Sequence, residues 1–220
     1  MSAGAATWAC AIACAVLVAA EWRRSRGLVV AAKLAASAAF LVVAVHTSGG
    51  RAFAAWMIAG LALGAAGDIF LLGRGRQMFL AGLVAFLLGH LAYVAGLAPL
   101  VGPGQWPAAA GASAVLPVVA GGAALAWLWP RLGALRVPVI VYIAAIAAMV
   151  VGAIAAYRAG ALPDPQRTRL LAGAALFFVS DLAVARDRFV AHGFPNRLWG
   201  LPAYYAGQLL IAWSIAVPPP

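Results

Sequence analysis

The sequence predicts an all-α polytopic membrane protein, a bundle of eight transmembrane helices. Of its 220 residues, 66% are hydrophobic and only 9% are charged, whereas soluble domains carry about 25% charged residues. The apolar residues form long runs, and glycine, proline and arginine gather in the short gaps between them. A run of about 20 apolar residues can cross the hydrocarbon core of a bilayer as one helix. We therefore expect a single integral membrane domain over residues 1–220.

Eight runs have this length and leave no stretch for a soluble domain: 3–20, 28–46, 52–72, 78–98, 109–129, 137–157, 170–186 and 199–217. The first run has its charges after it, from Glu21 to Arg26, and no positive segment before it. This order differs from that of a signal peptide, so we expect a retained span. Helix breakers and charges separate the later spans: Ser48-Gly49-Gly50, Gly73-Arg74-Gly75-Arg76, Gly102-Pro103-Gly104, Pro130-Arg131-Leu132-Gly133, Pro163-Asp164-Pro165 and Phe194-Pro195-Asn196.

The net charge of +10 indicates membrane topology and not nucleic-acid binding, because the arginines lie in the gaps between spans. The odd-numbered gaps hold ten basic residues and the even-numbered gaps hold four, Arg51, Arg158, Arg167 and Arg169. Short loops rich in Lys and Arg face the cytoplasm. We expect the odd loops inside and both termini outside a cell membrane, the cytoplasmic membrane of a bacterium. Three of those four residues lie in the loop between the sixth and seventh spans, which this orientation places outside the cell, so that loop does not follow the rule.

The sequence shows no motif for a metal, a cofactor or a reactive thiol. Cys10 and Cys14 are four residues apart on one face of the first span, a spacing that suggests packing and neither a disulfide framework nor a zinc site. The motifs of zinc proteases, nucleophile-elbow hydrolases and P-loop proteins do not occur. Acid and base work by carboxyl groups, without a cofactor, is the chemistry that remains.

Two aspartates, Asp68 and Asp181, lie inside apolar spans. A charged Asp at the centre of a membrane helix costs about 2.5–3.5 kcal/mol on insertion scales. The third and seventh spans run in the same direction, and each aspartate lies near the predicted inner end of its span, so both should share one depth. Gly82 and His90 are eight residues apart. Gly200 and Gln208 have the same spacing and lie 118 residues later in the chain. These spacings suggest two parallel four-helix repeats related by an axis along the membrane normal.

The two aspartates admit two interpretations. In the structural one, each is a polar contact between helices or an ion pair with Lys33, Arg74 or Arg186. Interhelical hydrogen bonds average only about 0.6 kcal/mol in one membrane protein, so they offset little of the insertion cost. In the functional one, burial disfavours the charged form of a carboxyl group and a second carboxyl nearby does so further. One group can then hold a proton while the other stays ionised.

Further polar residues on the spans are candidate substrate-binding groups. His90 should lie about 18 Å above the inner end of its span at 1.5 Å per residue, so a hydrogen bond to Asp68 is not expected unless the helix is tilted. Lys33 either snorkels to the interface, binds an anionic headgroup or sets the charge state of an aspartate. The other candidates, which could equally be interfacial or interhelical groups, are Arg74, Tyr93, Tyr142, Ser180, Tyr204 and Gln208.

Four stretches together resemble the YhhN-like membrane proteins, the lysoplasmalogenase family: Gly67 to Leu72, Phe79 to Tyr93, Phe177 to Asp181 and Pro202 to Ile211. The resemblance covers nearly the whole chain, although the Lys-Pro pair usual in that family is only half matched, since Leu34 follows Lys33. It implies an eight-helix hydrolase that cleaves the vinyl-ether bond of lysoplasmalogens. The products would be a fatty aldehyde and glycerophosphoethanolamine or glycerophosphocholine.

In this resemblance the catalytic aspartates correspond to Asp68 and Asp181, and the substrate is a lysophospholipid from the bilayer. Vinyl ethers hydrolyse through protonation at carbon, for which a positioned acid contributes about 10²–10⁴-fold. The second carboxylate could stabilise the resulting cation and activate water. We expect both carboxyl groups in one lipid-accessible hollow near the inner hydrocarbon edge, with Lys33 or Arg74 at the phosphate.

Two other functions deserve comparison. An intramembrane aspartyl protease also uses two membrane aspartates. However, the Gly-x-Gly-Asp pattern is missing at Asp68, Ser180 and not Tyr precedes Asp181, and no Pro-Ala-Leu triplet occurs. A proton-coupled transporter or lipid carrier would cycle protons on Asp68 and Asp181 during alternating access, which a parallel repeat suits.

Overall fold

The computed structural model describes residues 1–49 and 52–216, and these residues are almost entirely helical. Its α-helices are α1 (Ala3–Trp22), α2 (Arg26–Thr47), α3 (Ala52–Leu72), α4 (Arg76–Leu97), α5 (Trp106–Ala110), α6 (Val115–Leu128), α7 (Arg136–Arg158), α8 (Gln166–Phe189) and α9 (Phe194–Ser214). Short 3₁₀ turns flank α5 and α6. The predicted all-α class is confirmed.

Seven helical stretches of the described residues are long and apolar enough to cross a membrane: α1, α2, Phe53–Leu72, α4, Pro103–Arg131, Gly133–Arg158 and α8. The last helix, α9, is 21 residues long but carries more polar side chains. The chain is therefore a multi-pass membrane protein, as its composition predicts. Position 217, the predicted end of the eighth span, and Arg51, counted for the orientation, lie outside the described residues.

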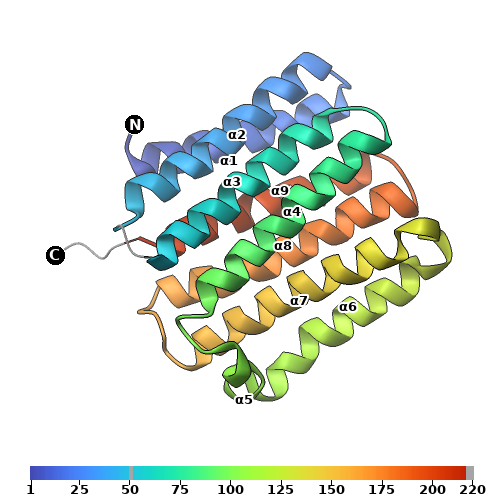
Figure 1. The fold of residues 1–220 in the computed structure, drawn as a ribbon. Coiled ribbons are helices and arrows are strands. Elements are labelled where there is room, and N and C mark those ends of the chain that lie inside the picture. Colours follow the sequence, from blue (N-terminus) through green and yellow to red (C-terminus); the bar gives the residue numbers. More distant parts are fainter. Residues whose placement is uncertain (50–51, 217–220) are drawn as a thin grey trace.

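The long helices run side by side, alternately up and down, in one bundle (Figure 1). α1 and α2 form one edge and α6 the opposite edge, with the other long helices between them (Figure 1). Arg26 Nη2 donates a hydrogen bond of 3.2 Å to Leu72 O, which joins the start of α2 to the end of α3. At the opposite end of the bundle, Ser48 after α2 forms a single bridge with Ala216 after α9.

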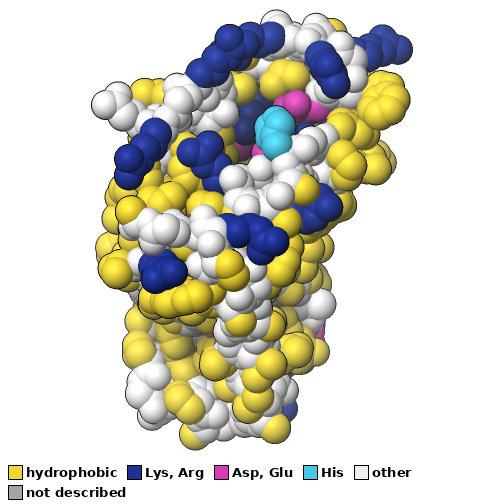
Figure 2. Space-filling view, turned by 90° about the vertical axis from the view of Figure 1, so that its right-hand side faces the viewer, with side chains coloured by type: hydrophobic (Ala, Val, Ile, Leu, Met, Phe, Trp, Pro, Cys, Tyr) yellow, Lys and Arg dark blue, Asp and Glu magenta, His cyan; other side chains and the backbone are white. Residues whose placement is uncertain are grey.

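One end of the bundle, which we call the basic end, collects the loops α1–α2, α3–α4, α6–α7 and α8–α9. Figure 2 looks onto this side and shows Lys and Arg side chains spread across it. Ten arginines lie in these loops or in the adjoining turns: Arg23, Arg24, Arg26, Arg74, Arg76, Arg131, Arg136, Arg186, Arg188 and Arg197. The described residues at the other end include Arg158, Arg167 and Arg169.

The helix packing repeats between the two halves. α3 pairs closely with α4, as α8 does with α9. α2 packs on α3 as α7 packs on α8, and the halves meet where α4 packs on α7 and α9 packs on α2. A two-fold axis along the bundle, which relates α2, α3 and α4 to α7, α8 and α9, produces these matching pairs of neighbouring helices. The packing therefore agrees with the repeat that the sequence suggests.

The predicted fifth span, 109–129, falls within the helical stretch Pro103–Arg131, but its α-helix is interrupted by a 3₁₀ turn at Gly111–Ala114. Gly111 adopts φ +57°, a left-handed conformation that glycine tolerates at no steric cost, and it ends α5. Regular α-helix resumes only at Val115. The buried Trp106 ring packs against Gly152 of α7, and its Nε1 donates to Val101 O at 2.7 Å. α5 is therefore a packed turn that leads into α6.

Candidate active site

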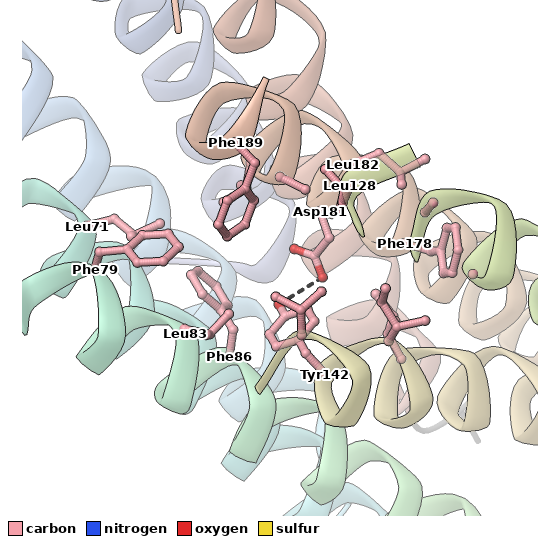
Figure 3. Close-up of a pocket in the computed structure, with 17 residues that line it drawn as sticks. Leu71, Phe79, Leu83, Phe86, Leu128, Tyr142, Phe178, Asp181, Leu182 and Phe189 are labelled. Atoms are coloured by element: carbon pink, nitrogen blue, oxygen red, sulfur yellow. Dashed lines mark hydrogen bonds between the residues drawn. The ribbon is translucent and has the colours of Figure 1, made fainter. Parts of the chain in front are cut away.

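A mostly apolar pocket lies between α4, α6, α7 and α8, toward the basic end (Figure 3). Its cavity volume is about 70 Å³, well below the range of about 300–1,000 Å³ typical of ligand sites. Aromatic rings supply much of its lining, including Phe79, Phe86, Phe178 and Phe189. Among the residues that line it, Asp181 supplies the one carboxyl group, and none is Lys, Arg or His.

Three helices position the carboxyl group of Asp181. It projects from α8 between the aromatic rings of the pocket, toward Tyr142 (Figure 3). The Tyr142 hydroxyl, on α7, donates a hydrogen bond of 2.9 Å to Oδ2. On α4, His90 Nε2 lies 3.5 Å from the same oxygen. The Asp181 side chain keeps 15% exposure, so the carboxyl is enclosed by protein but can be reached from the pocket.

His90 is completely buried behind Asp181. Its imidazole packs against the Phe177 and Tyr142 rings, with centroid distances of 4.5 and 5.2 Å. Neither ring nitrogen has a hydrogen-bond partner among the described residues. The depth estimate from the sequence disfavoured a contact with Asp68, and the structure instead places His90 beside the second aspartate.

Asp68 lies in a different cluster, on the face of α3 that meets α2 and α9. Lys33 Nζ is 3.0 Å from its Oδ1, while the Ser37 and Tyr205 hydroxyls donate to Oδ2 at 2.8 and 3.0 Å. The Lys33 ammonium therefore points inward to Asp68, which is one of the ion pairs considered from the sequence. Ser37 was not identified from the sequence, and Tyr205 was not among the predicted substrate-binding residues. For Ser37 a signal existed, since it follows Lys33 by four residues and so shares its helix face.

The two carboxyl groups do not share one hollow, contrary to the expectation from the sequence. Asp181 lines the pocket, whereas Asp68 is not part of its lining. A row of ring contacts lies between the two clusters. It leads from Tyr205 through Tyr204 and Phe177 to the imidazole beside Asp181, with centroid distances of 4.9, 5.5 and 4.5 Å.

The remaining predicted site residues lie outside the pocket lining. The Tyr93 hydroxyl donates to Gln208 Oε1 at 2.9 Å, and Gln208 Nε2 donates to the Tyr204 hydroxyl at 3.2 Å, deep in the core. Ser180 Oγ donates to a carbonyl three residues back in α8 at 2.8 Å. Arg74 is exposed in the loop between α3 and α4. Substrate binding by these residues stays a prediction.

Comparisons with known proteins agree with the motifs. The YhhN family model matches residues 28–215. A lysoplasmalogenase of Mycobacterium bovis is 35% identical over 162 residues, which is 71% of this chain and 58% of that protein. The lysoplasmalogenases TMEM86A of Bos taurus and Homo sapiens are 34% and 35% identical over 173 residues, 77% of this chain and 66% of each relative. The chain thus spans less than two thirds of these relatives. No solved structure matches it significantly.

Proposed function

This chain belongs to the YhhN family, and on that premise we propose that it is a membrane hydrolase of vinyl-ether lysolipids. The proposed substrate is a lysoplasmalogen taken from the surrounding bilayer, and the products are a fatty aldehyde and glycerophosphoethanolamine or glycerophosphocholine. Relatives named lysoplasmalogenase support this proposal. The structural observation that carries it is a carboxyl group, that of Asp181, inside an apolar pocket at the basic end.

The chemistry of the bond matches that environment. A vinyl ether is activated by protonation at the carbon remote from oxygen, which needs an acid that holds its proton near neutral pH. An apolar pocket is the setting in which enzymes keep such carboxylic acids. The same lining suits the hydrocarbon chain of the substrate. The Tyr142 hydroxyl and His90 both approach Oδ2, so we propose that Oδ1 faces the reacting carbon.

In the proposed first step, Asp181 transfers its proton to the vinyl carbon and leaves a carboxylate beside an oxocarbenium ion. Water then attacks the cationic carbon and gives up a proton to the carboxylate, which restores the acid and forms a hemiacetal. The hemiacetal loses its glycerol oxygen as a hydroxyl group and becomes the aldehyde. One water molecule is consumed. The Tyr142 hydrogen bond of 2.9 Å fixes the carboxyl orientation and stabilises its charge between the two steps.

The sequence predicts a catalytic role for Asp68 as well. Because its carboxylate is paired with Lys33 at 3.0 Å, we propose that it supplies a fixed negative charge and does not transfer the proton. In this proposal the two aspartates have different duties, one chemical and one structural.

Aldehyde release by the purified protein tests the function. Wild-type protein should release aldehyde from a lysoplasmalogen and none from the saturated alkyl ether of the same length. Asp181→Asn should lower kcat at least 100-fold, since the proton donor is lost, with an unchanged melting temperature. Asp164→Asn is the matched control, because Asp164 is exposed in a loop at the opposite end, where it contacts Arg167 and Thr168. Full activity of Asp181→Asn would contradict the mechanism.

A proton-coupled transporter or lipid carrier is the second candidate, favoured by the repeated packing of the two halves. The same assay separates the two functions. A carrier needs a sealed membrane for any effect and forms no aldehyde in detergent, whereas a hydrolase turns over in both settings.

A further inference from the structure

Arg188 lies where the pocket meets the basic end. Its guanidinium carbon is 4.3 Å from the centre of the Phe79 ring, and Phe79 lines the pocket. The next residue of α8, Phe189, also lines the pocket and packs edge-on against Phe79, with ring centroids 6.2 Å apart. Arg188 is exposed and forms no ion pair with an acid in the described part of the chain. An aromatic face thus holds an unpaired cation at the rim of the pocket.

A second arginine, Arg136, starts α7 on the other side of this rim. Its guanidinium stacks over the Trp129 ring, 4.6 Å from the centroid. The residues beside the two arginines, Leu135 and Phe189, pack against one small apolar cluster that contains Leu128, a lining residue of the pocket. The two arginines therefore flank the same part of the rim.

Several other arginines of the basic end have protein partners. Arg197 pairs with Asp187 at 2.9 Å, and Arg186 Nη1 donates to Asn196 Oδ1. Arg26 and Arg131 donate to backbone carbonyl groups, each at 3.2 Å. Arg188 and Arg136 differ in that aromatic rings, which leave the N–H groups free, are their described contacts.

The position of Arg188 along α8 fits a lysolipid whose reacting carbon lies at Asp181. Residues seven apart lie on one face of a helix, and seven residues rise by about 10 Å. In a lysoplasmalogen, seven bonds separate the carbon that is protonated from the phosphorus, a reach of about 8 Å when extended. A chain seated against Asp181 would therefore carry its phosphate to the level of the two rim arginines.

We propose that Arg188, with Arg136 opposite, binds the phosphate group of the lysolipid at the mouth of the pocket. The substrate class is taken from the proposed function. This site replaces Lys33, whose ammonium is occupied by Asp68 at 3.0 Å, as the phosphate ligand. Arginine suits the task because its planar fork donates two parallel hydrogen bonds to phosphate oxygens.

Binding measurements with non-hydrolysable probes test the site independently of turnover. The probes are a short-chain 1-O-alkyl lysophosphocholine, which lacks the vinyl group, and the 1-O-alkylglycerol of the same chain length, which lacks phosphate. Arg188→Gln should weaken binding of the lysophosphocholine about tenfold and leave the alkylglycerol unchanged. Arg188→Lys should recover part of the loss. Arg23→Gln is the control, since Arg23 is exposed at the same end but lies after α1, away from the pocket.

Equal weakening of both probes by Arg188→Gln, or no weakening of either, would overturn the assignment. Inorganic phosphate should not displace the lysophosphocholine, because it lacks the apolar chain, and efficient displacement would assign the rim to a free phosphate ion. Aldehyde release is measured separately on the same preparations. Its absence from wild-type protein would refute the proposed hydrolase, while the probe affinities would still decide the phosphate site.

Discussion

At the scale of single residues, the two intramembrane aspartates differ in what faces their oxygens. Asp68 has a lysine ammonium 3.0 Å away, and opposite charges attract strongly where water is scarce. Asp181 faces a phenol hydroxyl at 2.9 Å and an apolar pocket. In the first arrangement the Asp68 carboxyl group is occupied by a basic side chain of the protein. The second leaves a carboxyl group able to meet a substrate, which is why we assign proton transfer to Asp181.

Removing the hydroxyl that contacts Asp181 should slow the chemical step. In Tyr142→Phe the carboxyl loses its 2.9 Å hydrogen bond, and a hydrogen bond to a charged group is worth about 1.5–3 kcal/mol. We expect kcat to fall about 10- to 100-fold with little change in KM. Steady-state kinetics of aldehyde release measure both values. Tyr157→Phe is the control and should behave like wild type, because Tyr157 lies under Arg167 outside the pocket. An unchanged kcat in Tyr142→Phe would contradict the proposal that Tyr142 positions the Asp181 carboxyl group.

Breaking the Lys33–Asp68 pair should destabilise the fold, and removing both charges should restore much of the loss. Losing one partner of a buried ion pair costs about 3–5 kcal/mol, because the other charge is left uncompensated. Lys33→Met and Asp68→Asn should each lower the melting temperature in detergent, and the double variant should melt nearer to wild type. If activity returns with stability, Asp68 has a structural duty. A stable but inactive double variant would show that Asp68 takes part in the chemistry, against our proposal.

Residue types pointed to the polar groups inside the spans but could not decide among several possible partners for each. A carboxyl group in an apolar span is conspicuous in any sequence, so both aspartates could be singled out. Which side chain meets which depends on the rotation of each helix about its axis and on which helices are neighbours, and neither follows from spacing along the chain. Three roles for Lys33 therefore stayed open from the sequence, at the interface, at a headgroup or beside an aspartate, and its contact in the structure is Asp68.

At the scale of elements, apolar runs located the long helices well but misjudged their ends. α3 covers 52–72 as predicted, whereas α8 covers Gln166–Phe189 and not 170–186. Polar end turns, such as the one containing Arg186 and Arg188, continue a helix beyond its hydrocarbon part and leave no trace in hydropathy. Asp181 lies eight residues from the end of α8, about 12 Å along the axis.

The contact between α8 and α9 depends on two glycines. A Cβ atom at Gly173 would lie 2.9 Å from Gly207 O, and one at Gly207 would lie 3.0 Å from Gly173 O. Because backbone atoms cannot move aside, Gly173→Ala should separate the helices at a cost of about 1–3 kcal/mol, visible as a lower melting temperature. Gly122→Ala in α6 is the control, since no atom lies within 4 Å of the added methyl group. Equal melting temperatures for the two variants would contradict this account of the contact.

At the scale of the whole molecule, the two halves share a packing order but have diverged at their aspartates. Each aspartate is contacted from the preceding helix of its own half and from the last helix of the other half: α2 and α9 for Asp68, α7 and α4 for Asp181. The first half places a lysine where the second places a tyrosine. One aspartate is thereby closed by an ion pair while the other lines a pocket, so the proposed chemistry belongs to one half only.

The orientation of the bundle decides which leaflet supplies the substrate. Ten arginines at the basic end predict that this end is cytoplasmic. A membrane-impermeant maleimide should therefore label Ser2→Cys in intact cells but Gln77→Cys only after permeabilisation, since both positions are exposed at opposite ends. Cys10 and Cys14 are buried and should stay silent. The reverse labelling pattern would invert the topology, and the pocket mouth with Arg188 would then draw lysolipid from the outer leaflet and not from the inner one.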